Sequence, residues 1–469
     1  MTPELPRPAE RSWWLEEALT QAEFAGPEAP PLRGDTTADV VILGGGYTGM
    51  WSAWFLKERE PNLDVVLLEK DICGGGPSGR NGGFVNGLYE ELGLLVERFG
   101  DEGRRASELA ARSIDEVGRW CEANGVDAAY SRVDHLVVST SPEQDQTAAR
   151  VLDEADRLGI GDVHHALTDA EIRSRFDSPV VRSGYVVTHA ALVQPARLAR
   201  GLRRALIERG VRIHEQTPVT RFDARTAVAG TPSGTVRAGR AVLGLNAWAA
   251  TRPEFRRDLM VRETSIVITA PAPLEHINWT GGEGVYDLRT ALHYPRPTRD
   301  RRIAFGGTSL LTASRRADDP RYRYDERSVA ELVRDFRRWF PAFAAVPLEA
   351  AWSGPVDVSG LHLPFFGTLP GGLAHYGLGF TGNGVGPCHL GGKILSGLAL
   401  GIQDEATTLP LVDADRKRFP PEPLLTLGER IVSRAIRHRD QRLDAGRSPG
   451  RVTDALAHLP RKLGFNLGP

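Results

Sequence analysis

The sequence has little lysine, little cysteine and no long apolar run. Five of its 58 basic residues are lysine, and its three cysteines, Cys73, Cys121 and Cys388, are scattered along the chain. Scattered cysteines form neither a disulfide framework nor a CxxC pair, which favours a reducing compartment such as the cytoplasm. Stretches of low polarity such as 394–402 are much shorter than the roughly 20 residues that span a bilayer, so we expect no transmembrane segment.

An excess of one charge is missing as well. The formal net charge is -2 at pH 7, which gives no long-range attraction to phosphate backbones, and we expect no nucleic-acid partner. The N-terminus carries acid and proline where a signal peptide needs a basic patch followed by an apolar run. A length of 469 residues predicts two domains. Nothing in the sequence specifies an oligomeric state.

The first informative pattern is a βαβ unit that begins at Asp39. An apolar strand at 40–43 is followed by glycines, a helix to about residue 60 and a second strand at 65–68. The turn has the spacing G-x-G-x-x-G, which in this context binds the pyrophosphate of a dinucleotide at a helix N-terminus. The candidate contacts in this turn are Gly44, Gly45, Gly46, Tyr47, Thr48 and Gly49.

An acidic residue ends the second strand of this unit. Glu69 stands 20 residues after Gly49, where a carboxylate accepts hydrogen bonds from ribose hydroxyls and repels a 2′-phosphate. The sequence therefore favours a dinucleotide without that phosphate. Lys70 is a further candidate contact.

A second glycine-rich segment distinguishes FAD from NAD. Residues 74–83 contain six glycines in ten positions and follow Glu69 within five residues. Such a loop can lie flat against an extended cofactor, which FAD needs and NAD sites seldom do. The alternative is a flexible surface loop. The candidate cofactor contacts here are Ser78, Arg80, Asn81, Gly82 and Gly83.

A third glycine-rich element lies near the C-terminus and leads into a predicted helix at 387–400. A helix N-terminus directed at the flavin would stabilise the negative charge of the reduced ring without a lysine. The alternative is a tight strand-to-helix turn with no ligand. The candidate contacts are Gly379, Phe380, Gly382, Asn383, Gly384, Val385 and Gly386.

With these elements in this order, the chain resembles the D-amino-acid-oxidase-like FAD oxidoreductases, on the branch of glycine oxidase, sarcosine oxidase and γ-glutamylputrescine oxidase. The likeness covers about residues 12–430. It rests on the Trp13-Trp14 arm, residues 31–35, the first motif, the run 78–83, 246–248, 352–354, 364–367 and 379–386. The run SGRNGG together with GFTGNGVG is the most specific part.

The resemblance implies a fold, a reaction and further cofactor contacts. We expect an α/β plus α+β chain, with a discontinuous Rossmann-type FAD domain and a substrate domain built on a large, mainly antiparallel sheet. The reaction is oxidation of a C–N bond to an imine by hydride transfer to flavin N5. Val219, Asn246, Trp248 and Gly354 are further expected FAD contacts.

The chain also departs from this family at two points. Where sarcosine oxidases carry a lysine that holds the substrate carboxylate, this chain has Gly386, so a sarcosine-like substrate is not indicated. No histidine or cysteine stands where some relatives bond the flavin covalently, and we expect non-covalent FAD.

These patterns predict a division of the chain into segments. We expect an N-terminal arm at 1–37 and a C-terminal helical tail at 406–469. The FAD domain takes 38–125, 190–255 and 350–405, and the substrate domain takes 126–189 and 256–349. Leu424, Leu427, Ile431 and Ala435 form one helical stripe, which predicts a docked helix in the tail, with a membrane-surface or subunit contact as the alternative.

The substrate is expected to be a small amine, such as an amino acid or polyamine, with oxygen or another acceptor reoxidising the flavin. Tyr294 is the first candidate for the site, with His293, Trp352 and a carboxylate-binding Arg296. A dedicated base is not required if desolvation keeps the amine neutral. Further candidate wall residues are Tyr286, Phe305 and Phe365.

Other readings stay open at this point. One is a flavin enzyme that oxidises a 2-hydroxy acid, because one fold hosts several substrates. Another is a flavoprotein without turnover that serves in an assembly. The pair His164-His165 lacks the spacing of a zinc site, and we expect no metal.

Overall fold

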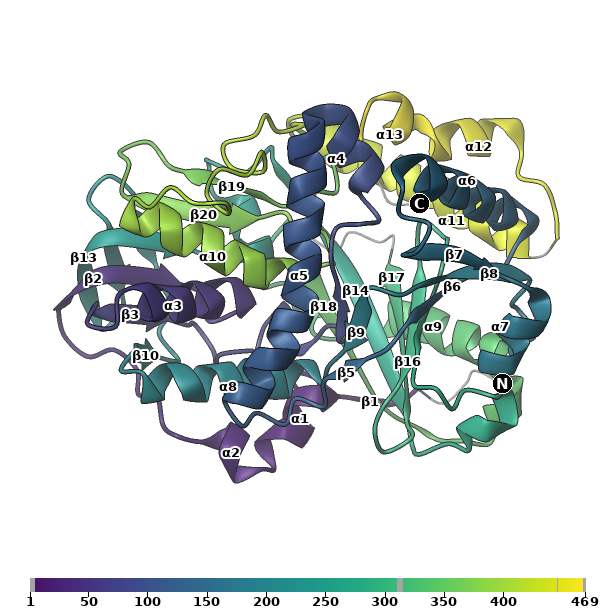
Figure 1. Cartoon of the computed structure of the whole chain (residues 1–469), viewed down its shortest axis with the longest axis horizontal. Helices are drawn as coiled ribbons and strands as arrows, with labels where there is room; N and C mark the ends of the chain where they lie inside the picture. Colours follow the sequence, from purple (N-terminus) through teal and green to yellow (C-terminus); the bar gives the residue numbers. More distant parts are fainter. Residues whose placement is uncertain (1–4, 310–314, 445, 467–469) are drawn as a thin grey trace.

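A computed structural model describes residues 5–309, 315–444 and 446–466. Two halves lie side by side along its longest axis, and the long helix α5 (Asp101–Ala123) runs between them (Figure 1). One half is built on an eight-stranded sheet, and the other on a five-stranded and a four-stranded sheet.

The βαβ unit forms as the sequence predicts. β2 (Thr36–Leu43) and β3 (Val65–Leu68) pair in parallel, and α3 (Tyr47–Arg59) connects them. Val41 and Leu43 pack into one hydrophobic cluster, while Val40 and Ile42 pack into another. Both faces of β2 are therefore covered, which explains why its apolar residues run without alternation.

Distant segments complete the eight-stranded sheet. Its strands run in the order β10-β3-β2-β13-β12-β11, with β20 paired to β13 and β19 paired to β20. The helices α3, α8 and α10 lie together over it (Figure 1). The added elements are α8 (Pro195–Glu208), β10 (Arg212–His214), β11 (Arg221–Asp223), β12 (Val228–Thr231), β13 (Gly234–Leu243), β19 (Phe365–Thr368), β20 (Ala374–Leu378) and α10 (Pro387–Leu400).

The other half divides its strands between two sheets. The five-stranded sheet has the order β1-β18-β14-β17-β16, and its pairs are antiparallel except β1 with β18. The four-stranded sheet has the order β15-β6-β8-β7. The strands are β1 (Arg7–Pro8), β6 (His135–Ser139), β7 (His164–Leu167), β8 (Ser183–Val187), β14 (Leu259–Thr269), β15 (Gly284–Asp287), β16 (His293–Pro297), β17 (Ile303–Ser309) and β18 (Leu348–Ser359).

One difference from the expected segments concerns this half. The segment 350–359, assigned by sequence to the FAD domain, lies in β18 and pairs along β14. Near the boundary between the halves, the chain turns at Gly100 with φ 58°, which separates α4 from α5. The remaining helices are α4 (Leu92–Phe99), α6 (Pro142–Leu158), α7 (Asp169–Arg175), α9 (Glu326–Trp339), α12 (Arg451–Ala457) and α13 (Leu459–Lys462), with a small sheet of β4 (Phe84–Asn86), β5 (Ser131–Arg132) and β9 (Ala190–Leu192).

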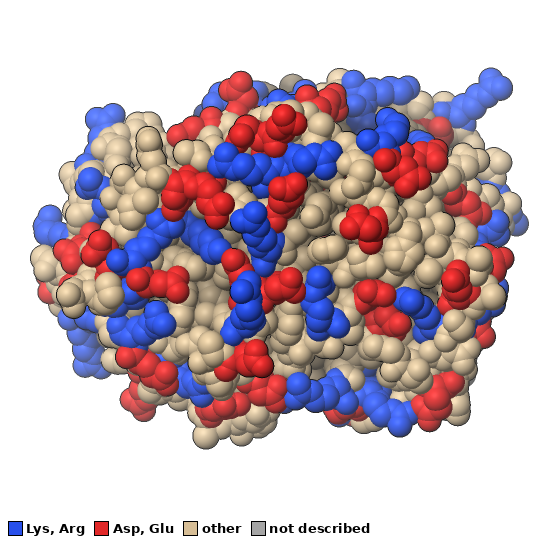
Figure 2. Space-filling model, in the orientation of Figure 1, with Lys and Arg blue, Asp and Glu red and all other residues tan. Residues whose placement is uncertain are grey.

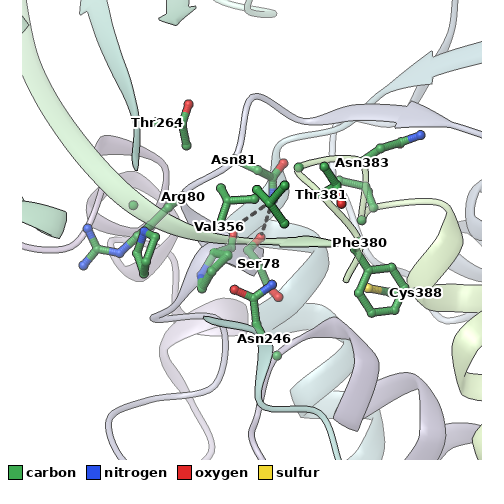
Figure 3. A pocket seen from close by; sticks show the side chains of 18 of the residues that line it. Ser78, Arg80, Asn81, Asn246, Thr264, Val356, Phe380, Thr381, Asn383 and Cys388 are labelled. Carbon is green, nitrogen blue, oxygen red and sulfur yellow. Dashed lines mark hydrogen bonds between the residues drawn. The ribbon is translucent and has the colours of Figure 1, made fainter. Parts of the chain in front are cut away.

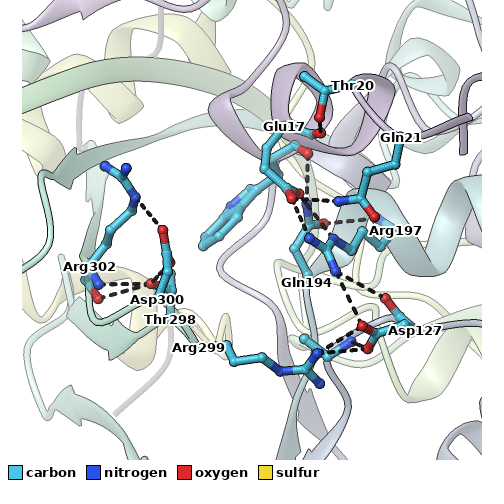
Figure 4. A network of polar contacts seen from close by, with 12 residues as sticks. Glu17, Thr20, Gln21, Asp127, Gln194, Arg197, Thr298, Arg299, Asp300 and Arg302 are labelled. Carbon is cyan, nitrogen blue, oxygen red and sulfur yellow. Dashed lines mark hydrogen bonds and ion pairs between the residues drawn. The ribbon is translucent and has the colours of Figure 1, made fainter.

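The N-terminal arm packs on the body through α1 (Trp13–Leu19) and α2 (Ala22–Ala25). Trp14 is buried, and Glu17 accepts hydrogen bonds from Gln194 and from Arg197 of α8. Arg197 also pairs with Asp127, as Figure 4 shows. These contacts hold the arm against the helix that follows β9.

The C-terminal stripe does not dock as predicted. In α11 (Leu424–Asp444), Leu424, Leu427 and Ile431 are exposed, and of the stripe only Ala435 is buried. A neighbouring face of the helix packs instead through the buried Leu425 and Ile436, and Asp440 and Asp444 pair with Arg289. The face seen in Figure 2 intersperses acidic and basic side chains. Within the described residues, no helix has the length and apolar character needed to cross a membrane.

Candidate functional site

One cavity of about 1180 Å³ connects the two halves. Its wall includes the turn after β2, the loop after β3, the turn after β20 and residues from the strands of the second half. Figure 3 shows Ser78, Arg80 and Asn81 of the second glycine loop on one side, and Phe380, Thr381 and Asn383 of the third element on the other. The three glycine-rich segments that the sequence singled out therefore converge on one space.

The first turn is shaped by contacts that exclude side chains. Gly44 has φ 107°, and a Cβ there would lie 2.5 Å from the carbonyl oxygen of Gly244. A Cβ at Gly49 would overlap the carbonyl oxygen of Gly44, so this glycine packs the helix on the turn and does not line the cavity. Gly44, Gly45, Gly46, Tyr47 and Thr48 do line it.

Glu69 braces the same turn. Its carboxylate accepts hydrogen bonds from the backbone N–H of Gly45 at 2.7 Å and of Asp71 at 2.9 Å. Burial raises the pKa of Glu69. Because a carboxylate offers about four acceptor positions, two remain for a ligand in the cavity that Glu69 lines.

The second glycine loop is held by its own polar side chains. Asn81 donates to the carbonyls of Pro77 and Ser78 and accepts from the N–H of Gly83. Arg80 donates to the carbonyls of Gly75 and Ser353, and burial lowers its pKa to about 10. The residues of this loop that line the cavity include Ser78, Arg80, Asn81 and Gly82.

Gly83 has a different part from the one predicted. It lies outside the cavity wall with φ 79°, and a Cβ there would overlap the carbonyl oxygen of Val193. Its small size therefore allows β4 to approach the segment that leads into α8. Sequence spacing could not separate this packing glycine from its cavity-lining neighbour Gly82.

The third glycine element is tied down by a buried carboxylate. Asp357 accepts from the N–H of Gly379 at 2.6 Å and from the side-chain amide of Asn246 at 2.7 Å. Burial raises the pKa of Asp357 to about 7. Gly379 and Gly386 lie outside the cavity wall. Gly386 packs closely on the neighbouring chain, because a Cβ there would overlap the carbonyl of Asn86. Phe380, Gly382, Asn383, Gly384 and Val385 line the wall, as do Asn246 and Gly354.

Another part of the cavity wall, near the first glycine turn, carries a cation on an aromatic face. Lys70 Nζ lies 4.3 Å from the ring centroid of Trp248, and both residues line the cavity with Val219. Trp248 Nε1 here and Asn383 Oδ1 in the third glycine element are buried without hydrogen-bond partners among the described residues. Buried polar atoms are normally satisfied. A bound dinucleotide fits this cavity because it can supply hydrogen-bond partners to both of these atoms.

The five-stranded sheet forms the part of the wall next to the second glycine loop. Thr264 and Tyr294 are hydrogen-bonded through their hydroxyls, and Thr264 donates in turn to the carbonyl of Gly307. The Tyr294 hydroxyl therefore donates to Thr264 and keeps its own oxygen as an acceptor. The Tyr294 ring lies against Gly82, where a Cβ would be 3.0 Å from it. Burial raises the pKa of Tyr294 to about 12.

Three of the four predicted catalytic residues do not line the cavity. His293 is buried between Asp287 and Asp335, at 2.9 and 3.2 Å. Arg296 donates to the backbone carbonyls of Val193, Gly82 and Pro297, and Trp352 donates to the carbonyl of Arg80 at 2.8 Å. These side chains brace the walls, so we no longer assign them to the substrate.

The wall candidates divide in the same way. Tyr286 lines the cavity, whereas Phe305 and Phe365 are buried in hydrophobic clusters away from it. Several other cavity residues are not predicted by the sequence. No motif marks them, because they come from strand positions and helix ends far apart in the chain. They include Glu90, Glu91, Glu154, His164, Arg262 and Thr264.

Comparison with known proteins identifies the family. The model of the FAD dependent oxidoreductase family matches residues 39–398. This protein belongs to the FAD dependent oxidoreductase family. The match covers all three glycine-rich elements and the strands that carry Thr264 and Tyr294. FAD is therefore the dinucleotide for which the converging loops are built.

Relatives agree with this family assignment. The chain is 29% identical over 378 residues to the gamma-glutamylputrescine oxidoreductase of Escherichia coli, with 79% of this chain and 85% of that protein covered. It is also 29% identical to a probable oxidoreductase, OrdL, of Rhizobium meliloti, with 84% and 90% covered. Glycine oxidase from Geobacillus kaustophilus shares the fold with a TM-score of 0.64 at 22% identity, with 78% and 96% covered.

Proposed function

We propose that this FAD-dependent oxidoreductase oxidises a C–N bond of a small amine to an imine. The observation that carries the proposal is that the cofactor cavity continues past Gly82 to a wall of hydroxyl, aromatic and acidic side chains, among them Tyr294, Tyr286 and Glu90. Such a wall can hold a cationic or neutral amine. The similarity to gamma-glutamylputrescine oxidoreductase over most of both chains supports the same substrate class.

The glycine elements would hold the cofactor in this proposal. Backbone around Gly46 and Gly82, the Glu69 carboxylate, and Lys70 with Trp248 form its binding surface. Bound FAD supplies a hydride acceptor for the carbon next to nitrogen. Every other requirement, namely orientation, exclusion of water and control of the amine proton, falls to the protein.

Tyr294 is the residue that we assign to orienting the amine. Its hydroxyl hydrogen is given to Thr264, so its oxygen can accept an N–H of the substrate. Because its pKa is raised to about 12, Tyr294 stays protonated at neutral pH and does not act as a base. Desolvation inside the cavity lowers the pKa of an amine and supplies its neutral form.

We propose that the FAD is bound without a covalent link. Cys388 is the cysteine of the cavity wall, and its thiol is hydrogen-bonded with the hydroxyl of Thr48 at 3.2 Å. Burial raises the pKa of Cys388 to about 12. The thiolate is the nucleophilic form of cysteine, so this side chain is unreactive. Denaturing the protein in acid should release all of the flavin into the supernatant.

Oxygen is the electron acceptor that we propose, because a small apolar molecule can enter the cavity without a second docking surface. Lys393 does not line the cavity, since it pairs with Glu116 at 2.7 Å. Lys393 therefore cannot assist the reaction of oxygen at the flavin, and any oxidase activity would proceed without it. Formation of one hydrogen peroxide per imine in air supports this acceptor, and reduction only of added quinone contradicts it.

An anaerobic titration tests the reaction itself. Purified FAD-loaded protein is mixed with amines, amino acids and 2-hydroxy acids, and the visible absorbance of oxidised flavin is followed. Bleaching by amines supports the proposal. Bleaching by hydroxy acids alone would replace it with oxidation of an alcohol carbon, and a flavin that no compound in the panel reduces would indicate a protein without this turnover.

A further inference from the structure

One part of the cavity wall has its own chemistry. It is formed by the segment entering α4, by α6, and by strands of the four-stranded sheet. Tyr185 and Tyr286 belong to one buried cluster there, with Phe84 and Tyr294 packed against it. The polar residues of its wall are Glu90, Glu91, Glu154 and His164.

Two neighbouring carboxyl groups line this part of the wall. Glu90 accepts a hydrogen bond from the hydroxyl of Tyr286. Oε2 of Glu91 is closed to solvent and has no hydrogen-bond partner among the described residues. Burial raises the pKa of Glu91 to about 8, so this carboxyl holds a proton at neutral pH unless a cation lies beside it. Among the described residues of the wall, no lysine or arginine comes from α4, α6 or the four-stranded sheet.

Asp287, another acidic residue of this region, is already paired with a histidine. Asp287 lines the cavity, but its carboxylate is hydrogen-bonded with Nδ1 of His293 at 2.9 Å. The backbone N–H of the same histidine also donates to it. Although burial opposes protonation, Asp287 and Asp335 raise the pKa of His293 to about 9. At neutral pH the histidine is therefore charged and paired, whereas Glu90 and Glu91 face the cavity without a cation.

A second, independent feature is the histidine of this wall. His164 is 3% exposed, and its Nδ1 has no hydrogen-bond partner among the described residues. Burial lowers its pKa to about 4, so the ring is neutral and one of its nitrogens can accept a hydrogen bond. The ring packs beside Tyr185, with centroids 5.9 Å apart. A buried acceptor without a donor is costly, and a ligand with N–H groups would satisfy it.

Aromatic contacts link this part of the wall to the part at Gly82. The rings of Tyr294 and Phe84 have centroids 6.0 Å apart, and those of Phe84 and Tyr286 are 6.3 Å apart. The carboxylate of Glu90 thus lies two ring contacts away from the tyrosine that touches the second glycine loop. A flexible aliphatic chain can pass along these rings and place its two ends at the two sites.

We propose that the acidic end, defined by Glu90, Glu91, His164 and Tyr286, binds the remote ammonium group of an aliphatic diamine whose other C–N bond is oxidised. The inference rests on the proposed function and specifies its substrate class. An ammonium group donates three hydrogen bonds, which match the carboxylates and the histidine, and tyrosine faces attract a cation. The described residues contain no group of three or more His, Cys, Asp or Glu side chains arranged to hold a metal ion.

Paired ligands test the subsite without relying on turnover. FAD-loaded protein is reduced with dithionite, so that no amine can be oxidised, and binding is measured by anaerobic calorimetry. The series runs from putrescine to hexamethylenediamine, each compared with the monoamine of equal chain length. We expect at least one diamine to bind about 10- to 100-fold more tightly than its monoamine, as charge-assisted hydrogen bonds predict.

Isosteric variants assign that preference to residues. Glu91→Gln and Glu90→Gln should each reduce the diamine preference about tenfold or more, with a smaller effect on the monoamine than on the diamine. Glu97→Gln is the matched control, because Glu97 is exposed on α4 and does not line the cavity. Flavin content and the unfolding midpoint show whether each variant is folded.

The outcomes separate this proposal from the function on which it rests. Equal binding of every diamine and its monoamine to the wild-type protein overturns the subsite, even if amines reduce the flavin. An equal loss for both ligands in Glu91→Gln and Glu90→Gln also overturns it. A diamine preference in calorimetry together with a flavin that amines never reduce would support the subsite and contradict amine oxidation.

Discussion

The two ends of the cavity are built in opposite ways. At the cofactor end, backbone is brought close to the ligand by glycines, and the side chains there, such as Asn81 and Asp357, mainly hold loops in place. At the acidic end, the wall is made of side chains from segments that lie far apart in sequence. Because FAD is the same in every member of the family, its site can be fixed in backbone, whereas substrate choice is carried by exchangeable side chains.

The largest effect is expected from a substitution that disrupts FAD binding at the cofactor end. Gly49→Ala places a Cβ in the carbonyl oxygen of Gly44, which α3 can relieve only by moving away from the turn. We expect loss of bound FAD and a lower unfolding midpoint, with a cost of about 1–3 kcal/mol or more. Flavin absorbance of the purified protein and thermal unfolding measure both effects.

Gly428→Ala is the control for this prediction. Gly428 lies in α11, and a Cβ there would meet nothing within 4 Å. Normal flavin content is expected for it. Full flavin content in Gly49→Ala would mean that the close packing of helix and turn is not required for binding.

The next effect tests the charged pair beside the acidic end. The pKa of His293 is about 9 in the folded protein against an ordinary value of 6.5. A raised histidine pKa adds stability that is complete below pH 6.5 and is lost as the pH rises through 9. We expect the free energy of unfolding to fall by on the order of 3 kcal/mol across that window.

His293→Gln identifies the source of that pH dependence. The variant should be less stable than the wild-type protein at pH 6.5 and should show a flatter profile up to pH 9, measured by urea unfolding. Parallel profiles for the two proteins would show that His293 is not the group that titrates.

A smaller effect is expected where the two ends meet. Tyr294→Phe removes the oxygen that we assign to orienting the amine and keeps the ring against Gly82. We expect kcat/KM for amines to fall about 5- to 20-fold, the cost of one hydrogen bond, with flavin content unchanged. An unchanged kcat/KM would remove Tyr294 from the site.

The smallest effect on substrate binding is expected at Arg296. Its guanidinium donates to backbone carbonyls and does not line the cavity. Arg296→Met should therefore leave KM within about twofold for both amines and amino acids, while the unfolding midpoint falls because buried carbonyls lose their donors. A large rise in KM for acidic substrates alone would return this arginine to the substrate site.

Much of the cofactor end could be predicted from sequence. The spacing of glycines after β2 and the placement of Glu69 report on local backbone geometry, which neighbouring residues determine. The sequence could not show which individual glycines line the cavity and which pack against other segments. Gly82 lines the cavity and Gly83 packs against Val193, and this difference depends on which segment passes behind the loop.

The substrate wall was predicted less well, and β16 shows why. Tyr294 faces Gly82 and the cavity, while its neighbour His293 faces Asp287 and Asp335. Successive strand residues point to opposite faces, and nothing in a single sequence says which face meets a ligand. The stripe in α11 failed for a related reason, because its periodicity shows a possible apolar face but not whether a partner covers it.

By itself, the sequence determined the βαβ unit, the three glycine-rich segments and the dinucleotide class, because each depends on residues close together in the chain. The tertiary structure alone decided that Glu90, Glu91, His164 and Tyr286 share one end of a cavity. Those residues come from different helices and strands, and their meeting is fixed by how the sheets and helices pack rather than by any spacing along the chain.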